Sequence, residues 1–361
     1  MAFDILRIII CPRCQSNQME LVPLPDKNSF RHCGLILCKS CNEIFYKIHN
    51  IFVLLDKELA NKKIISDFVT VYKEEITKIY HQYNENDRLF CSVVDNNLDW
   101  KKSEIEFWDN RKYKRKVGGS HIKNYNYNRM EVRKKNISSI LKSSIKGKVL
   151  VEFGGGDGAT IFYTLNPSKY QYTYINTDIS FNALLLGQDY HPNGIFIQCD
   201  ATNPPFQKET FDIIVNFGTL HHLPENDKVI ENQIDLLKSG GYLALHEPID
   251  RRGAILSRFN LFRKLNPEQS DHNEYIVEKR VLMLFERNGR IINYYVEYSP
   301  LRTWLVRLNE LTVKFNNKLM HWIFANIDQI VIKTAGKLTD SFKGSSALIL
   351  FKKEKRSLEK D

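Results

Sequence analysis

The chain has 361 residues, of which 43% are hydrophobic and 26% charged, and its formal net charge is +10. This composition is typical of a soluble globular protein and excludes a disordered or a membrane-embedded chain, while the length suggests two folding units. Residues 1–10 are apolar, but they lack a basic segment and a small-residue cleavage site, so a signal peptide is not indicated. We therefore expect a cytoplasmic protein.

Four of the seven cysteines form two Cys-x-x-Cys pairs near the N-terminus. The pairs are Cys11 with Cys14 and Cys38 with Cys41, and 23 residues separate them. Two such turns can complete a tetrahedral site of four thiolates for zinc. Since a closed four-thiolate site leaves no position for a substrate, this zinc is expected to be structural. Cys33 lacks a paired partner and is expected to be a buried thiol.

The surroundings of the cysteines form a recognisable outline. In chain order it comprises Cys11-Pro12, Cys38 to Cys41, Phe45-Tyr46, Ile48 and the apolar run Ile51 to Leu55. This outline resembles the small zinc-ribbon proteins that bind and activate tRNA and release-factor methyltransferases. The resemblance implies a zinc ribbon over residues 1–56.

Positive charge is concentrated in residues 101–148, where fifteen Lys or Arg stand against four Asp or Glu. Such a segment could meet RNA phosphates, an anionic membrane surface or a charged substrate, or it could be a solvated helical linker. Apolar residues recur at near-helical spacing from 56 to about 83, which predicts a connecting helix. We assign residues 57–147 to a helical, basic linker and cap.

From Lys148 onward, short apolar runs alternate with helical stretches, a pattern typical of a parallel sheet with covering helices. Seven strands are predicted, at 148–153, 172–177, 194–199, 211–217, 241–246, 290–298 and 347–352. Between the last two strands, at about 300–342, apolar residues at helical spacing predict an amphipathic helical lid. Its aromatic residues, flanked by Lys and Arg, leave contact with a membrane surface open.

A glycine-rich loop, Gly154 to Gly158, follows the first of these strands and opens a helix. Glycines there let the backbone approach a ligand closely, although the loop alone also fits a dinucleotide site. Asp178 ends the next strand about twenty residues on, where a carboxylate can accept both hydroxyl hydrogens of a ribose. Asp200 ends the strand after that, placed to accept from an adenine amino group.

Further motifs follow in order: Pro204-Pro205-Phe206, Phe211 to Asn216, Leu220 to Leu223 and Leu236 to Leu243. In that order and spacing, residues 148–353 resemble the class I S-adenosylmethionine-dependent methyltransferases. The resemblance implies an α/β, Rossmann-like fold with a seven-stranded methyltransferase sheet whose last strand is antiparallel. It also implies S-adenosylmethionine as the cofactor.

The same resemblance implies which residues hold the cofactor. Glu152 would lie near the methionine amino group, Asp178 would hold the ribose, and Asp200 with Ala201 would meet the adenine. The full set of expected cofactor-binding residues is Glu152, Gly154, Gly156, Gly158, Asp178, Asp200, Ala201 and Asn216. In members of the resembled family, helices that precede the first strand close over the cofactor. Aromatic residues in the same part of this chain could therefore form a roof over the cofactor, or they could pack in the core: Phe107, Trp108, Tyr113, Tyr125 and Tyr127.

Two adjacent histidines, His221 and His222, follow the fourth strand beside the expected position of the methyl group. Methyl transfer is an in-line displacement that needs alignment and, for a hydroxyl or carbon acid, removal of a proton. A histidine suits that role, and we favour His222 as the general base. The alternative is that both histidines only pack and cap the loop. Glu247 ends the fifth strand on the same face and could touch the substrate.

Three functions stay open. The motifs after Glu247 resemble methyltransferases that act on glycans, lipid-linked intermediates or other small molecules, and we favour this class. A ribosomal-RNA or other RNA base methyltransferase is the alternative, because some of these join a zinc ribbon to this fold and the basic segment suits phosphates. The third possibility is a non-catalytic scaffold or activator with a vestigial cofactor site, against which the intact glycine loop and acids argue.

Overall fold

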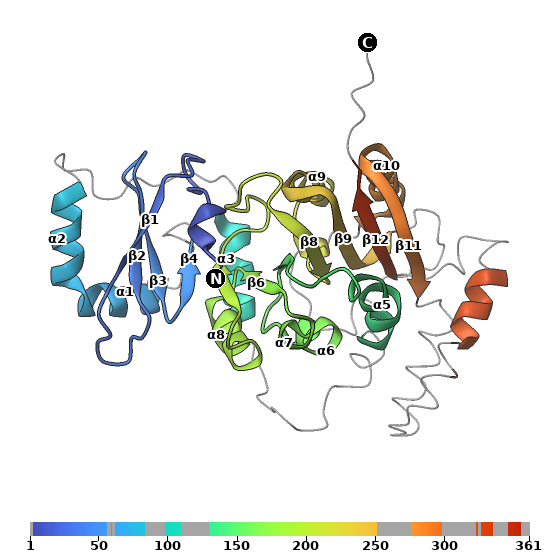
Figure 1. Ribbon diagram of the computed structural model, residues 1–361, viewed down its shortest axis with the longest axis horizontal. Helices are drawn as coiled ribbons and strands as arrows, with labels where there is room; N and C mark the ends of the chain where they lie inside the picture. Colours follow the sequence, from blue (N-terminus) through green and yellow to red (C-terminus); the bar gives the residue numbers. More distant parts are fainter. Residues whose placement is uncertain are drawn as a thin grey trace, which may run out of the picture.

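The computed structural model describes residues 3–55, 59, 62–83, 98–109, 130–250, 276–297, 323, 326–334 and 346–354. Its described strands form one mixed sheet with helices on both faces (Figure 1), which confirms the predicted α/β class. Most of the predicted lid, about 300–342, and residues 110–129 of the basic segment lie outside the described residues. The lid and its contact with a membrane therefore stay predictions. In the described part, no helix is long and apolar enough to cross a membrane.

The seven predicted strands are all present. They are β5 (Val149–Phe153), β6 (Thr173–Asp178), β7 (Ile195–Gln198), β8 (Phe211–Phe217), β9 (Leu237–Asp250), β11 (Gly289–Glu297) and β12 (Ser346–Lys353). They lie in the order β7-β6-β5-β8-β9-β12-β11. The first five are parallel to one another, and β12 runs antiparallel to both β9 and β11, as expected for the last strand.

The sheet does not end at seven strands, so the predicted count is wrong. It has twelve strands, because four N-terminal ones extend one edge and a short strand pairs with β9. The additional strands are β1 (Met19–Pro23), β2 (Gly34–Cys38), β3 (Ile44–Ile48), β4 (Ile51–Val53) and β10 (Ile276–Val277). β4 runs parallel to β7, and its residues Ile51 and Val53 lie opposite Phe196 and Gln198. Pairing of this kind satisfies the backbone groups that the edge of β7 would otherwise expose.

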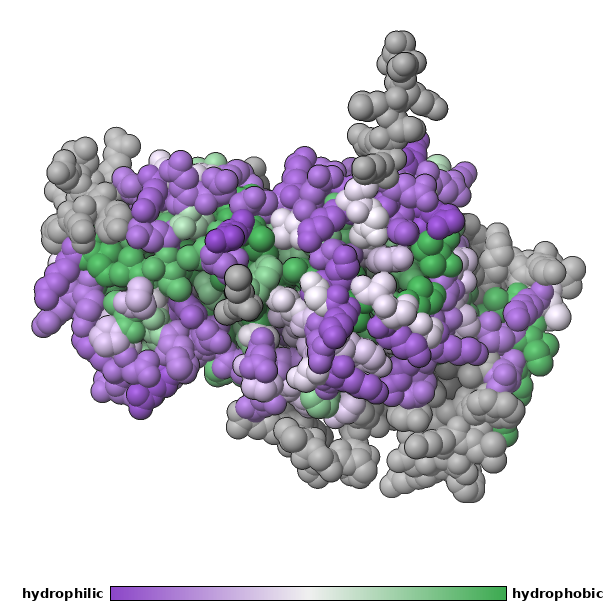
Figure 2. Space-filling model, in the orientation of Figure 1, coloured by the Kyte–Doolittle hydropathy of each residue, from purple (hydrophilic) through white to green (hydrophobic). Residues whose placement is uncertain are grey.

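The strands β2, β3 and β4 are buried on both faces, since side chains alternate along a strand and nearly all of theirs are buried. Leu35 and Leu37 pack in one cluster with Phe68 and Tyr72, whereas Ile36 belongs to the cluster on the other face. The helices of this unit are η1 (Ile5–Arg7), α1 (Lys62–Val71) and α2 (Lys73–Tyr83), so the connecting helix predicted over 56–83 is divided in two. Figure 2 shows the apolar residues over β1–β4 as a band bordered by polar ones.

Helices cover both faces of the central strands. One face is covered by α9 (Asn226–Leu236) and α10 (Glu278–Asn288), and the other by η2 (Lys134–Ser138), α5 (Ser139–Leu141), α6 (Ala159–Leu165), α7 (Pro167–Tyr170) and α8 (Phe181–Tyr190) (Figure 1). The remaining helices, α3 (Leu98–Asp109) and η3 (Leu220–His222), lie at the carboxyl ends of the parallel strands. The packed core thus holds the carboxyl ends of the parallel strands in place, and loops and helices meet at these ends.

Candidate functional site

A cavity of about 230 Å³ lies at the carboxyl ends of the strands β5 to β8. Its described lining residues are Glu104, Trp108, Gly154, Gly155, Gly156, Asp157, Thr177, Asp178, Ile179, Cys199, Asp200, Ala201, Phe217, Gly218, Thr219, His222 and Leu223. The chain runs outward from β5 in both directions, through β6 on one side and β8 on the other. Ligands of open α/β sheets bind at this kind of switch point.

The glycine loop forms the floor of this cavity. Gly154, Gly156 and Gly158 have φ angles of +61°, +57° and +69°, which favour glycine. A Cβ on Gly154 would lie 2.2 Å from a side-chain atom of Thr219, and one on Gly158 would lie 2.8 Å from His191. Packing against His191 therefore requires glycine at position 158. Gly158 is not among the described lining residues of the cavity. A Cβ on Gly156 would meet nothing within 4 Å, so open space lies above that residue.

Two of the predicted acids face the cavity from neighbouring strand ends. The carboxylate of Asp178 accepts hydrogen bonds from the backbone N–H groups of Gly156 and Ser180, both at 2.8 Å. Burial raises the pKa of Asp178 to about 6. The carboxylate of Asp200 forms an ion pair with Lys101, at 2.7 Å. The structure thus brings both acids and the glycine loop together in one cavity.

The side chains of Glu152 and Asn216 are not among the described lining residues of the cavity, so their expected contact with the cofactor stays a prediction. Glu152 is 2% exposed and lies beneath the glycine loop, where it accepts a hydrogen bond from the Tyr174 hydroxyl at 2.6 Å. Asn216 is fully buried and donates to Gln233 at 2.7 Å. Since side chains alternate along a strand, Asn216 faces away while the next residue, Phe217, lines the cavity.

Helix α3 covers the cavity and contributes Glu104 and Trp108 to its lining. The end of the helix is held by Asp109, whose carboxylate accepts from the Ser180 hydroxyl at 2.6 Å and from the backbone N–H of Asn182. Of the predicted aromatic roof, Trp108 lies as expected. The tyrosines at 113, 125 and 127 are outside the described residues.

Sequence reasoning missed Lys101 and Glu104 of this helix. Lys101 holds Asp200, and Glu104 lies in the cavity wall, where it accepts a hydrogen bond from the Trp108 indole at 2.9 Å. These three α3 residues have the spacing i, i+3, i+7 and therefore share one face of the helix. This helical spacing, which includes an aromatic residue, is the signal in the sequence that could have identified Lys101 and Glu104.

The two adjacent histidines have different surroundings. His222 lines the cavity, and the Trp108 ring meets its ring edge-on at a centroid distance of 5.6 Å. His221 is absent from the described lining, and its Nδ1 lies 2.8 Å from a carboxylate oxygen of Glu247. The two imidazole rings lie against each other, 4.0 Å apart. Only His222 is thus placed to meet a molecule in the cavity.

Glu247 is not among the described lining residues of the cavity, and its expected contact with the substrate stays a prediction. It is 2% exposed, and one carboxylate oxygen accepts from the backbone N–H groups of Gly218, Thr219 and Leu220, at 2.8–3.1 Å. Burial alone would raise the pKa of Glu247, but the bond and charge of His221 and the N–H donors hold it below its usual value. Glu247 therefore holds the turn that carries both histidines.

Among the basic residues of segment 101–148 that the structure describes, two are buried. Lys101 is 8% and Arg133 is 6% exposed. Arg133 donates to Nδ1 of His246 at 3.0 Å, and its guanidinium lies over the Phe217 ring. These two residues have internal roles and offer no surface for phosphates. The run 111–116 is outside the described residues, so RNA binding stays a prediction.

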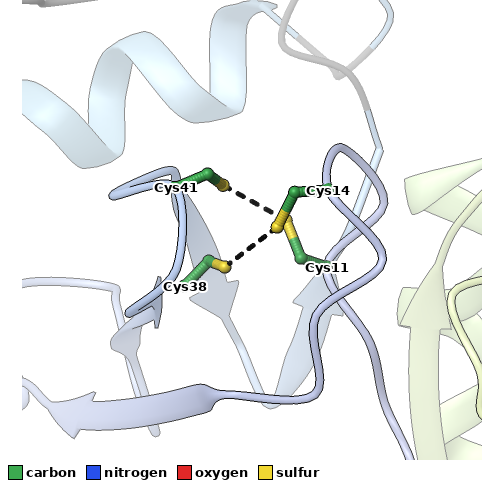
Figure 3. A group of neighbouring side chains, drawn as sticks. All are labelled: Cys11, Cys14, Cys38 and Cys41. Atoms are coloured by element: carbon green, nitrogen blue, oxygen red, sulfur yellow. Dashed lines mark hydrogen bonds between the residues drawn. The ribbon is translucent and has the colours of Figure 1, made fainter.

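The four paired cysteines converge in a thiol cluster (Figure 3). All four sulfur atoms lie within 4.8 Å of one another, with Cys11 and Cys41 at 3.7 Å and Cys14 and Cys38 at 3.5 Å. Burial raises the pKa of Cys41 to about 11. Cys33 is a buried thiol outside this cluster, as expected. The cluster offers four sulfur ligands to a metal ion.

The comparison with known proteins adds an assignment for the centre of the chain. Residues 151–245 match the family model described as a methyltransferase domain. The matched segment contains the glycine loop, both carboxylates that line the cavity with it, and the pair of histidines.

Curated relatives match just over a quarter of this chain, and the chain covers well under half of each of the two described here. The chain is 33% identical over 107 residues to a highly reducing polyketide synthase of Phaeosphaeria nodorum, covering 27% of this chain and 4% of that protein. It is 29% identical over 103 residues to a phthiotriol/phenolphthiotriol dimycocerosates methyltransferase of Mycobacterium leprae, covering 28% of this chain and 38% of that one. Among solved structures, geranyl diphosphate C-methyltransferase from Streptomyces coelicolor aligns with a TM-score of 0.43 and 13% identity, over 63% of this chain and 76% of that one.

Glu152 generates a prediction about pH. Burial is the largest effect on this group and raises the pKa of Glu152 to about 8, compared with ~4.3 in an unfolded chain. Between these values the folded state binds more protons than the unfolded state, so Glu152 makes the protein less stable as the pH rises from about 5 to about 8. The variant Glu152→Gln keeps an acceptor for Tyr174 but cannot ionise. We expect it to lose this part of the pH dependence.

Urea unfolding at pH 5 and pH 8 measures the difference. Relative to the wild type, Glu152→Gln should gain at least ~1 kcal/mol in unfolding free energy between the two pH values. Asp178 titrates in both proteins and cancels from the comparison. The exposed Glu106→Gln serves as the matched control and should gain nothing. Parallel pH profiles for Glu152→Gln and the wild type would disprove the assignment.

Proposed function

We propose that this chain is an S-adenosylmethionine-dependent methyltransferase acting on a small-molecule, glycan or lipid-linked acceptor. One observation carries the proposal. Asp178 and Asp200, at adjacent strand ends, share a single cavity with the glycine loop inside a segment that matches a methyltransferase domain. The relatives' names, which refer to a polyketide synthase and to a dimycocerosates methyltransferase, support an acceptor of this class.

The lining residues fit the cofactor. Asp178 would accept the ribose hydroxyls, and Asp200 with Ala201 would meet the adenine, while open space above Gly156 leaves room for the ligand. S-adenosylmethionine would supply a methyl group bound to a positively charged sulfur. The protein's own contribution is to align donor and acceptor and to keep water away from them.

His222 is the candidate general base. It is the cavity-lining histidine of the adjacent pair, and it can take a proton from an acceptor hydroxyl or carbon acid. Its position depends on its neighbours, because Trp108 lies edge-on to the ring and His221 is tied to Glu247. His221 and Glu247 are positioning residues, since neither is among the described lining residues.

We also propose that the thiol cluster holds a structural zinc ion. In a tetrahedral site with Zn–S bonds of ~2.3 Å, the sulfur atoms lie ~3.8 Å apart. The observed separations of 3.7 Å and 3.5 Å are close to this value. Four thiolates leave no coordination position open, so the ion would stabilise the fold and take no part in methyl transfer.

Loss of the Asp178 carboxylate tests the cofactor site. We expect Asp178→Ala to weaken binding of S-adenosylmethionine and S-adenosylhomocysteine at least about tenfold, since both share the ribose. Isothermal titration calorimetry on folded, zinc-loaded protein measures this, with the exposed Asp189→Ala as the matched control. If the folded wild type bound neither ligand, the enzyme proposal would fail and the scaffold alternative would be favoured.

Replacement of His222 tests the base. Removing a general base typically costs 10²–10⁴-fold, so His222→Ala should slow turnover at least tenfold. Cofactor affinity should stay within about twofold, because the adenine and ribose contacts are intact. The measurement is release of S-adenosylhomocysteine with an acceptor found by screening small molecules and lipid extracts. Unchanged turnover would reject the base assignment.

Metal analysis tests the zinc site. Purified wild-type protein should hold about one zinc per chain and Cys38→Ser much less, while Cys33→Ser should retain it. Because Cys38 ends β2 in the same sheet as β7, loss of zinc should also lower the midpoint of thermal unfolding. Full zinc content in Cys38→Ser, or unchanged thermal stability after chelation, would contradict the proposal.

A further inference from the structure

Glu104 is a carboxylate in the cavity wall to which the family resemblance assigns no role. It is 4% exposed, and its Oε2 accepts the indole N–H of Trp108 at 2.9 Å. It comes from helix α3, outside the segment that matches the methyltransferase domain. The indole hydrogen bond fixes the direction of the carboxylate within the cavity wall.

The position of Glu104 along the cavity follows from its neighbours on the helix. Lys101 reaches Asp200 at the expected adenine end, and Trp108 meets His222 at the expected methyl end. The seven residue steps from Lys101 to Trp108 rise ~10 Å along the helix, enough to cover much of an adenosyl group. Glu104 shares their helix face and lies between the two contacts. It is therefore placed opposite the part of the ligand between the ribose and the methyl group.

The charge of the cavity matches one form of the cofactor. Among the described lining residues, four carry carboxylates and none is Lys or Arg; the four are Glu104, Asp157, Asp178 and Asp200. Lys101, outside this lining, pairs with Asp200 and supplies its counter-charge. S-adenosylmethionine has a sulfonium, an ammonium and a carboxylate, and so a net charge of +1 at neutral pH. S-adenosylhomocysteine lacks the sulfonium and is net neutral. A carboxylate in a buried wall interacts strongly with such a charge because the local dielectric constant is low.

We propose that Glu104 faces the sulfonium and makes the site prefer the methyl donor over its demethylated product. The proposal rests on the proposed function. During transfer, the acceptor's lone pair forms the new bond to the methyl carbon, and the carbon–sulfur bond breaks with its electron pair left on sulfur. The sulfur becomes neutral, so the interaction with Glu104 ends. Product release is thereby favoured at the moment that the reaction is complete.

Calorimetry with three ligands tests this assignment. The ligands are S-adenosylmethionine, S-adenosylhomocysteine and sinefungin, an analogue with an ammonium group near the position of the sulfonium methyl. In Glu104→Gln, which keeps the shape and an acceptor for Trp108, affinity for the two cationic ligands should fall about tenfold or more. Affinity for S-adenosylhomocysteine should stay within about twofold. The exposed Glu106→Gln, on the same helix, should bind all three ligands as the wild type does.

Other outcomes overturn the assignment. An equal loss for all three ligands would place Glu104 against the shared adenosyl or amino-acid parts, and no loss for any would remove it from recognition. A second variant, Glu104→Asp, guards against misfolding: it keeps the charge and should retain a preference for the cationic ligands. A wild-type protein that binds none of the three would refute the proposed function itself.

Discussion

The parallel pairing of β4 with β7 is the constraint on which the covered cavity depends. It joins the N-terminal strands to the strands β5 to β9 in one sheet. The chain leaves β4 through Leu55, which packs with Leu59, with Ile105 of helix α3 and with Ile179 at the end of β6. The strand pairing and this small cluster together place α3 across the cavity. The N-terminal unit is therefore part of the architecture of the site.

Two buried glutamates at the site have opposite electrostatic surroundings. Glu247 accepts three backbone N–H groups and faces His221, and this favours its charged form despite complete burial. Glu152 accepts one phenolic hydroxyl from Tyr174, which does not offset the loss of hydration. One carboxylate therefore orders the histidine turn as an anion, whereas the other packs beneath the glycine loop as a neutral acid.

The features that the sequence predicts correctly are those encoded locally. Strand periodicity gave the seven central strands, and short motifs placed the glycine loop, Asp178 and Asp200 at strand ends that meet. The pairing of β4 with β7 has no local signal, because edge pairing depends on backbone groups common to all residues. Glu104 lies fifty residues before the loop that it covers, so its helical spacing with Lys101 and Trp108 marks a helix face but not the cavity that this face covers. The N–H donors that bind Glu247 depend on the conformation of a turn, which the sequence does not reveal.

The ion pair between Lys101 and Asp200 bears on how the adenine would be recognised. An ionised carboxylate has about four acceptor sites, so Asp200 can hold Lys101 through one oxygen and the Thr202 backbone N–H through the other, and still accept from an amino group. Burying this acid without a counter-charge would be costly, and Lys101 supplies that charge from the covering helix. The proposed adenine contact and the position of α3 would therefore depend on the same carboxylate. Recognition of the base would then be coupled to the helix that carries Glu104 and Trp108.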